Sequence, residues 1–325
     1  MLKIEDIKAL NIEMSSKCIG NCPFCSRSQK VREYGEHDIS LADFQRLPQR
    51  LLKHLERMTF AGNFGDFCSN PAFPDVVAYI REVNADIIME GDTNGSVQNV
   101  DWWQRLGSLF GGGDMIFALD GLQDTHRIHR RGTDFKKILK NIEAFISAGG
   151  RAYWKFIVFE HNQHQIEAAE KLAQEMGFAG FMLMASRDYD ENRRIPTNMD
   201  VPIKRELYYG NLKQLGKAER YALCKPFHSG SIYIAADGSI HPCCFAHCMY
   251  ITSHHRWFDF IGPLIEKYGT EINFKHRDIA DILAGPYFRA VQAKSRTNRY
   301  CLMKCNRNKN KIRKKLVLYK TTFDN

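Results

Sequence analysis

Three cysteines near the N-terminus have the spacing of iron–sulfur ligands. Cys18, Cys22 and Cys25 follow a short apolar run, and with ten cysteines in the whole chain a chance match has odds of about one in a hundred. Three thiolates on one loop can bind three irons of a cubane cluster, which leaves the fourth iron for a ligand that is not protein. A zinc knuckle or a disulfide loop is the alternative. Zinc needs a fourth cysteine or histidine nearby, and the next ones downstream are His37 and Cys68.

These residues resemble the radical SAM superfamily, whose signature is C-x3-C-x2-C with an aromatic residue before the last cysteine, here Phe24. The resemblance implies a 4Fe–4S cluster whose open iron binds the amino and carboxylate groups of S-adenosylmethionine (SAM). One electron passed through the cluster then breaks a carbon–sulfur bond and releases methionine and a 5'-deoxyadenosyl radical. That radical abstracts a hydrogen atom from the substrate. The cofactors supply this chemistry, while the protein supplies position, dryness and access.

Length and composition indicate a globular protein of one large domain or two of ordinary size. The chain has 325 residues, of which 44% are hydrophobic and 26% charged. Its first residues are charged where a signal peptide needs an apolar core, and no apolar run approaches the roughly 20 residues of a membrane span. We therefore expect a cytoplasmic protein with no membrane partner, whose cysteines bind metals rather than form disulfides.

Short apolar runs that alternate with amphipathic stretches indicate a parallel sheet with helical crossovers. The clearest helix pattern runs from Asp134 to Ala148, with Thr133 placed to cap its start, and another runs from about Gln165 to Met176. Six β-then-α units are fewer than the eight of a closed barrel, and the superfamily core is similarly a six-unit partial barrel. The expected fold is α/β, a partial (β/α)6 TIM-like barrel. Its strands are Ala9–Met14, Met58–Ala61, Asp86–Met89, Met115–Leu119, Ala152–Phe159 and Gly180–Met184.

The cysteine loop directly follows the first expected strand. Parallel sheets bind ligands at the carboxyl ends of their strands, so the loop lies where a site is expected.

A second group of cysteines lies in the C-terminal part of the chain. Cys224, Gly238 and Cys243 resemble the C-x(9–15)-G-x4-C opening of SPASM and twitch extensions, which carry auxiliary iron–sulfur clusters. Asp237-Gly238 between two apolar runs is also a good hairpin signal. The resemblance to the shorter twitch form implies one auxiliary 4Fe–4S cluster in a small α+β extension. Its ligands would be Cys224, Cys243, Cys301 and Cys305.

Alternatives remain open for this second group. Cys244 or Cys248 can replace Cys243 as a ligand, and a structural zinc is the alternative to the cluster. Cys68 is expected to be a buried or loop thiol without a metal role. The expected regions are a core at 1–186, a linker or substrate-facing loop and helix at 187–223, the auxiliary domain at 224–305 and a basic tail at 306–325.

The resemblance also implies residues that bind SAM. The segment from Gly62 to Asp66 occupies the place of the glycine-rich motif that meets the methionine amino group, and glycines let backbone approach a ligand closely. An aspartate takes the place of the ribose-binding residue, and an arginine that of the carboxylate-binding residue. For the arginine we prefer Arg131, with Arg130 nearly equal. The implied residues are Gly62, Asn63, Asp66, Thr93, Asn94, Asp120, Arg131 and Asn162.

Three further assignments stay open. Asn162 is equally suited to capping the helix that starts there. Glu13 and Lys155 are expected to point into the barrel, where they either touch substrate or form internal ion pairs. No catalytic base is assigned.

The expected function is hydrogen abstraction from a peptide or protein, as in ribosomal peptide maturation by crosslinking or side-chain oxidation. The net charge of +9 mildly favours an acidic peptide. Alternatives are dehydrogenation of a small alcohol or sugar, modification of a nucleic acid, which is not favoured, and an iron–sulfur or zinc protein without catalysis. A reducing protein such as flavodoxin or ferredoxin is the expected partner. The eight Lys and Arg residues from Lys304 to Asn325 are interpreted as a solvated end, and binding of nucleic acid or an acidic peptide is the alternative.

Overall fold

The protein is described by a computed structural model that covers residues 1–30, 32–186, 190–198, 221–252, 260–298, 301–302, 305 and 317–323. The fold is α/β, and its mostly parallel strands form an open sheet, as expected for a partial barrel. The chain forms two compact units that combine distant segments. The first contains Met1–Cys18, Cys25–Glu90 and Lys217–Arg307, and the second contains Ile19–Phe24, Gly91–Gly216 and Asn308–Asn325. The four consecutive regions expected from the sequence stay a prediction.

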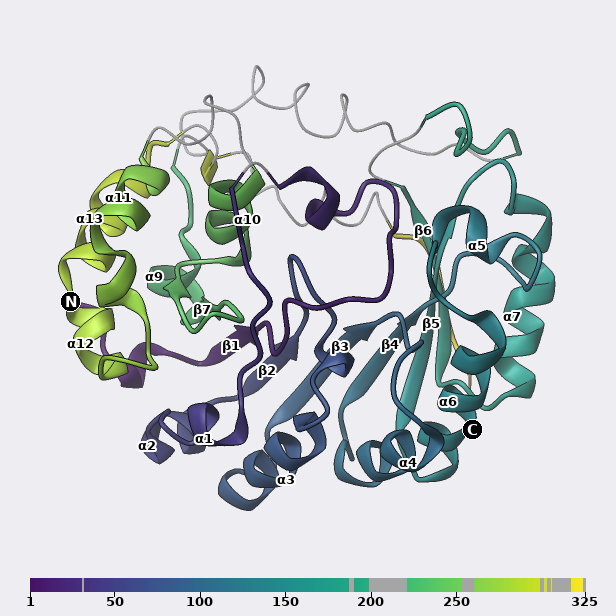
Figure 1. Ribbon diagram of the computed structural model, residues 1–325, viewed down its shortest axis with the longest axis horizontal. Helices are drawn as coiled ribbons and strands as arrows, with labels where there is room; N and C mark the ends of the chain where they lie inside the picture. Colours follow the sequence, from purple (N-terminus) through teal and green to yellow (C-terminus); the bar gives the residue numbers. More distant parts are fainter. Residues whose placement is uncertain are drawn as a thin grey trace. The chain divides into compact units, whose positions relative to one another are not determined.

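The first unit builds its sheet from both ends of the chain. Strand β1 pairs in parallel with β2 on one side and with β7 on the other, and β8 pairs antiparallel with β7. The N-terminus lies beside α12 (Figure 1). The strands are β1 (Ala9–Ile12), β2 (Arg57–Phe60), β7 (Ser231–Ile234) and β8 (Ile240–His241). The helices are α1 (Leu41–Phe44), α2 (Gln49–His54), α3 (Phe73–Val83), α9 (Lys225–Ser229), α10 (Cys244–Thr252), α11 (Ile261–Tyr268), α12 (Ile279–Ala284) and α13 (Pro286–Ser295).

The second unit repeats the strand–helix alternation. Strand β5 pairs in parallel with β4 and β6, and α6 and α7 run along β5 and β6 (Figure 1). Strand β3 (Ile88–Thr93) begins in the first unit and ends in the second. The other strands are β4 (Asp114–Ala118), β5 (Arg151–Val158), β6 (Gly180–Ala185) and β9 (Val317–Thr322). The helices are α4 (Val100–Leu109), α5 (His126–His129), α6 (Phe135–Ser147) and α7 (Ile166–Glu175).

All six expected strands are present, and β3 differs most from the expectation because it extends to Thr93. Glu90 and Asp92 interrupt the apolar pattern of the sequence, yet they alternate with buried residues as a strand requires. Glu90 pairs with Arg57, at 2.6 Å between Oε1 and Nη1. Asp92 pairs with Lys155 of β5. Both acidic side chains therefore lie on the half-exposed face of the strand.

Helix α6 begins one residue later than the sequence predicts, so Thr133 as its cap is wrong. The side chain of Asp134 accepts a hydrogen bond from the Lys137 N–H at 3.2 Å. The Thr133 hydroxyl instead donates to the Arg130 carbonyl at 2.7 Å and lies 2.9 Å from His126 Nε2. A tertiary contact therefore decides which of two good capping residues is used.

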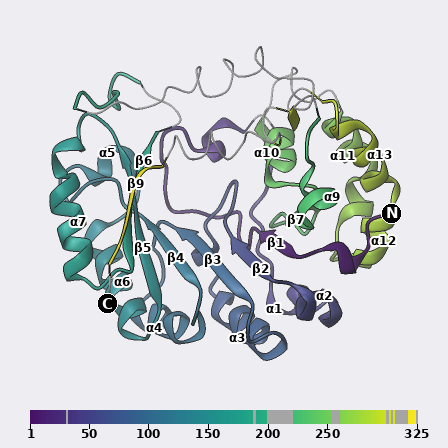
Figure 2. The same ribbon diagram turned by 180° about the vertical axis from the view of Figure 1, so that it is seen from behind.

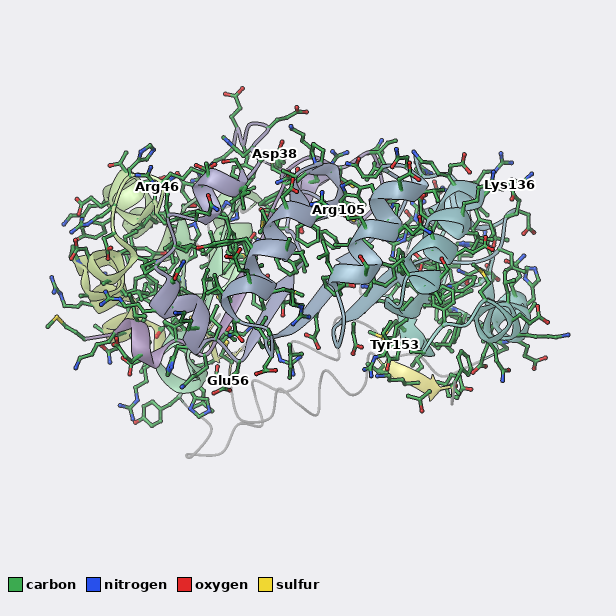
Figure 3. All side chains as sticks on the ribbon, turned by 90° about the horizontal axis from the view of Figure 1, so that it is seen from below. Asp38, Arg46, Glu56, Arg105, Lys136 and Tyr153 are labelled. Carbon is green, nitrogen blue, oxygen red and sulfur yellow. The ribbon has the colours of Figure 1, made fainter. Side chains whose placement is uncertain are left out.

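The expected basic tail contains a strand. Strand β9 lies antiparallel beside β6 (Figure 2). The Tyr319 hydroxyl donates to Glu170 of α7 at 2.5 Å. Lys320 Nζ lies 4.6 Å from the ring centroid of Tyr153, which is labelled beside this strand in Figure 3. This part of the expected solvated end is thus ordered against the second unit. Among the described residues no helix is long and apolar enough to cross a bilayer.

Candidate functional site

The N-terminal cysteine loop follows β1, and hydrogen bonds hold its backbone in place. Cys18, Cys22 and Cys25 are half-buried, and none of the three forms a disulfide. The Cys18 carbonyl accepts from Arg27 Nη1 at 2.6 Å, and the Cys25 carbonyl accepts from the Ser28 N–H at 3.1 Å and from its hydroxyl at 2.8 Å. These hydrogen bonds hold the loop through its backbone carbonyls.

Cys22 lies beside a buried ion pair of the second unit. Arg130 Nε donates to Asp120 Oδ2 at 2.5 Å, and the same guanidinium hydrogen-bonds the side chain of Cys22. Asp120 is fully buried, and its other oxygen accepts from the Ile157 N–H at 2.7 Å. Burial by itself would raise the pKa of Asp120, but the positive charge of Arg130, the neighbouring His129 and the hydrogen bonds from Ile157 and Arg130 together outweigh it and hold this pKa below its usual value. Asp120 therefore orients Arg130, and its expected contact with a ribose stays a prediction.

The two candidate arginines have different surroundings. The Arg131 side chain is exposed, and its carbonyl accepts from the Asn21 N–H at 2.8 Å, which anchors the cysteine loop. Only 15% of the Arg130 side chain is exposed. The geometry favours Arg130 for binding a carboxylate near Cys22, whereas the sequence resemblance favoured Arg131.

Five buried nitrogen atoms around Phe24 and Phe159 have no hydrogen-bond partner in the described part of the chain. They are Nδ1 of His129, both ring nitrogens of His161, and Nε and Nη1 of Arg193. Arg193 lies 5.1 Å above the Phe24 ring, His129 lies 4.8 Å from the Phe159 ring, and His161 stacks on Phe159 at 5.3 Å. Burial lowers the pKa of His129 to about 4, so its ring is neutral near pH 7.

Unpartnered buried nitrogens cost free energy, and a ligand that supplies both hydrogen-bond acceptors and a donor would recover it. Neutral imidazoles, one guanidinium and flat aromatic walls suit a ligand with both an anionic group and an aromatic heterocycle. Sequence reasoning missed His129, His161 and Arg193. Their three distant positions gave no motif, and their convergence depends on the fold.

Three other expected site residues of the second unit use their side chains to shape turns. Thr93 accepts from the Gly95 N–H at 2.9 Å, and Asn94 accepts from the Ser96 N–H at 2.9 Å, which form the turn after β3. Asn162 accepts from the Phe159 N–H at 2.7 Å and donates to the Ile157 carbonyl at 3.0 Å. Asn162 precedes a 3-10 turn, Gln163–Gln165, but its side chain does not cap that turn. Direct contact of these residues with a cofactor stays a prediction.

In the first unit, the loop Gly62–Asp66 is held by Glu13. The Glu13 Oε1 atom accepts from the Phe64 N–H at 2.7 Å and from the Gly65 N–H at 3.0 Å. A Cβ on Gly65 would lie 1.9 Å from the Ser15 carbonyl oxygen, so this position needs glycine. The Asp66 carboxylate accepts from the Cys68 N–H at 3.1 Å. Glu13 therefore stabilises backbone through hydrogen bonds, whereas the sequence analysis considered substrate contact or an internal ion pair for it.

Four cysteines of the first unit line one pocket. Cys224 precedes α9 and Cys243 precedes α10. The Cys305 carbonyl accepts from the Leu223 N–H at 2.7 Å, so Cys305 lies beside Cys224. The rest of the lining is mostly apolar, with Phe245, Met249, Phe260 and Val291. The four cysteines are Cys224, Cys243, Cys301 and Cys305.

The pocket favours Cys243 over its two neighbours. Cys244 and Cys248 do not line the pocket, and Cys248 Sγ lies 3.5 Å from the Ser26 hydroxyl. Burial raises the pKa of Cys224 to about 11 and that of Cys301 to about 12, so metal binding here releases protons. Cys68 is fully buried, as expected.

Four thiols around one apolar pocket suit a cluster in which each binds a different iron. Four thiolates can also bind a single zinc, but all four sulfur atoms must then lie about 2.3 Å from one point. Within the described ranges no three His, Cys, Asp or Glu side chains converge on one metal ion.

Lys155 also points to the half-exposed face of its sheet and pairs with Asp92 of β3. It forms the internal ion pair that was one of its two expected roles. About a quarter of its side chain stays exposed.

The sequence matches two family models, the Radical SAM superfamily over residues 12–173 and the SPASM iron–sulfur cluster-binding domain over residues 224–306. No curated protein is significantly similar to it. Similar solved structures include Streptococcus suis SuiB bound to S-adenosylmethionine, with 13% identity, a TM-score of 0.59 and coverage of 88% of this chain and 68% of that one. They also include a histidine-tagged anSMEcpe with bound AdoMet, with 17% identity, a TM-score of 0.54 and coverage of 87% and 79%. At these identities the likeness concerns the fold.

Proposed function

Because this chain belongs to the radical SAM superfamily and carries an iron–sulfur cluster-binding SPASM domain, we propose that it abstracts a hydrogen atom from a peptide or protein. It is an enzyme whose cofactors are 4Fe–4S clusters and SAM. When bound, the reduced cluster and SAM together supply the hydrogen-abstracting radical. The residues of this chain bind, orient and shield these cofactors.

Each unit, taken by itself, contains residues suited to the cofactors. Cys18, Cys22 and Cys25 would bind the first cluster, which leaves one iron for SAM. In the second unit Arg130 carries a charge complementary to the SAM carboxylate, and Asp120 orients it. The unpartnered nitrogens of His129, His161 and Arg193 would bind polar groups of the adenosyl moiety beside Phe24. In the first unit the loop Gly62–Asp66 presents backbone that can bind the methionine amino group.

We assign one auxiliary cluster to Cys224, Cys243, Cys301 and Cys305, which line the apolar pocket of the first unit. A cluster held by these cysteines would supply a one-electron acceptor or a binding position for the substrate. A small reducing protein such as flavodoxin or ferredoxin would supply the electron for SAM cleavage.

Two solved structures support a peptide substrate. SuiB was solved with its precursor peptide SuiA, and anSMEcpe was solved with the Cp18Cys peptide. The SuiB complex has a TM-score of 0.57 and covers 88% of this chain, and the anSMEcpe complex has a TM-score of 0.54 and covers 86%. The net charge of +9 favours a peptide with acidic residues.

SAM cleavage in the anaerobically reconstituted protein tests the enzyme. Reduced wild-type protein should release 5'-deoxyadenosine from SAM, detected by chromatography. Cys22→Ala should abolish the release because only two thiolates remain, and Cys68→Ala, at a buried cysteine outside both ligand sets, should retain it. Release that persists in Cys22→Ala would refute the assignment of the first cluster.

Mass spectrometry of candidate peptides tests the substrate class. Short acidic peptides encoded by neighbouring reading frames should lose two hydrogen atoms when incubated with the reduced enzyme and SAM. Oxidation of small alcohols or sugars, with every such peptide unchanged, would contradict the peptide proposal.

A further inference from the structure

We infer that Tyr233, in the C-terminal region of the chain, is a positioning residue for the loop Gly62–Asp66 and thereby strengthens SAM binding. The inference rests on the proposed function, in which this loop binds the methionine part of SAM. A residue of the cluster-binding region would thereby help to shape the SAM site. All the contacts that carry it lie within the first unit.

The first contact runs through Glu13. The Tyr233 hydroxyl donates to Glu13 Oε2 at 3.0 Å, and Glu13 Oε1 accepts from the Phe64 and Gly65 N–H groups. Tyr233 is fully buried and Glu13 is 1% exposed. One carboxylate thus joins the tyrosine on β7 to two consecutive backbone amides of the loop, and a buried carboxylate is strongly dependent on each of its donors.

The second contact runs through Asn63. Its Nδ2 donates to the Tyr233 hydroxyl oxygen at 3.1 Å and to the Cys244 carbonyl at 2.9 Å. Cys244 is the residue next to Cys243 of the auxiliary pocket. The loop is therefore held through the Asn63 side chain and through its backbone N–H groups, and the Tyr233 hydroxyl takes part in both attachments.

The loop has little room to adopt another arrangement. A Cβ on Gly62 would lie 2.6 Å from Glu13 Oε1 and 2.6 Å from the Gly65 carbonyl oxygen. Glu13 can therefore approach the loop backbone this closely only because residue 62 is a glycine. Loss of the tyrosine hydroxyl removes one hydrogen-bond donor of Glu13 and leaves those of the Phe64, Gly65 and Ala236 backbone, so the carboxylate holds the loop less firmly.

The variant Tyr233→Phe removes only the hydroxyl. Equilibrium dialysis of the reconstituted protein should show SAM binding weakened about tenfold, which corresponds to about 1.4 kcal/mol. Tyr287→Phe is the control. Tyr287 is equally buried in the same unit, but its hydroxyl lies 3.3 Å from His241 Nδ1 rather than at the loop, so SAM affinity should not change.

Hydrogen exchange gives a readout that needs no cofactor. Amide exchange at Phe64 and Gly65, followed by mass spectrometry, should be faster in Tyr233→Phe than in the wild type and unchanged in Tyr287→Phe. If Tyr233→Phe does not fold, Glu13→Gln takes its place, because an amide presents fewer acceptors to the loop and should give the same two effects.

The outcomes separate this inference from the proposed function. Wild-type protein that binds no SAM would refute the proposed function, and exchange at Phe64 and Gly65 would still test the attachment. Wild-type protein that binds SAM, with unchanged affinity and unchanged exchange in Tyr233→Phe, would overturn the inference alone.

Discussion

Asp120 and Arg130 show how single residues are specialised in the second unit. A guanidinium that contacts Cys22 must be held in place and must stay charged. Asp120 does both, because its buried carboxylate binds Arg130 on one side and the Ile157 N–H on the other. His129 adds a further contact, with Nε2 3.8 Å from Asp120 Oδ2. The chemistry of this site therefore depends on a buried charge pair rather than on an isolated arginine.

Removal of either partner of this pair should be costly. Arg130→Met should lower the free energy of unfolding by about 3–5 kcal/mol, because Asp120 would stay buried without its countercharge. Arg131→Met, at the exposed neighbour, should change it by less than about 0.5 kcal/mol. Urea unfolding of the two variants measures the difference. Equal effects would show that Asp120 does not depend on Arg130.

A buried histidine should make stability depend on pH. Burial lowers the pKa of His126 to about 4. The Asp120 backbone nitrogen donates to His126 Nδ1 at 3.3 Å, and only an unprotonated Nδ1 can accept this hydrogen bond. The unfolded chain, with an ordinary pKa near 6.5, binds this proton first as the pH falls. The His126 contribution should therefore be complete above about pH 6.5 and be lost progressively toward pH 4.

Thermal unfolding at several pH values measures this effect. His126→Gln should flatten the decline between pH 6.5 and 4 relative to the wild type. His228→Gln, at an exposed histidine, should leave the decline as it is. An identical decline in all three proteins would show that His126 does not titrate as its surroundings require.

At the scale of elements, the loops after β1 and β2 are shaped by close backbone contacts. The Asp66 N–H donates to the Lys17 carbonyl at 2.8 Å, so the loop Gly62–Asp66 lies directly against the start of the cysteine loop. Gly65 makes this approach feasible, because any side chain there would overlap the Ser15 carbonyl. The glycine is needed for contact between two loops as well as for the turn.

Substitution of this glycine should therefore disrupt the site. Gly65→Ala should lower the free energy of unfolding by several kcal/mol, on the order of 3, and should abolish detectable SAM binding, since its Cβ would lie 1.9 Å from an oxygen atom. Gly111→Ala is the matched control, because a Cβ there meets nothing within 4 Å. Urea unfolding and equilibrium dialysis give the two readouts. Wild-type behaviour of Gly65→Ala would exclude the close contact.

At the scale of the whole molecule, distant parts of the sequence complete each unit. Strand β7, from the C-terminal region, pairs in parallel with β1, with Asn11 opposite Tyr233. Strand β9, from the end of the chain, pairs with β6. The auxiliary pocket belongs to the same unit as β1 and the loop Gly62–Asp66. The cluster-binding region is thus part of the sheet of its unit rather than an appendage.

The iron content of the whole protein should reflect two clusters. Reconstituted wild-type protein should contain about eight irons per chain, from two 4Fe–4S clusters, measured by colorimetric iron analysis. The double variant Cys301→Ala, Cys305→Ala should retain about four, because only the first cluster keeps its three cysteines. Cys244→Ala, outside the pocket, should keep about eight. A full iron content in the double variant would remove the auxiliary site from the proposal.

The sequence by itself determined the superfamily and the alternation of the first six strands with helices, and it predicted two sets of cysteine ligands. These features depend on the spacing of residue types within short segments of the sequence. Cys18, Cys22 and Cys25 lie on one loop, and the apolar periodicity of Phe135–Ser147 predicts its helix without reference to the rest of the chain.

Only the tertiary structure decided which neighbour performs which role. It buried Arg130 and exposed Arg131, directed Cys243 but not Cys244 to the pocket, and gave the cap of α6 to Asp134 instead of Thr133. It also brought His129, His161 and Arg193 together and joined Tyr233 to Glu13 across 220 residues. The physical reason is that adjacent residues of similar type differ only in the direction of their side chains. Packing against distant segments sets that direction, and no short stretch of sequence contains it.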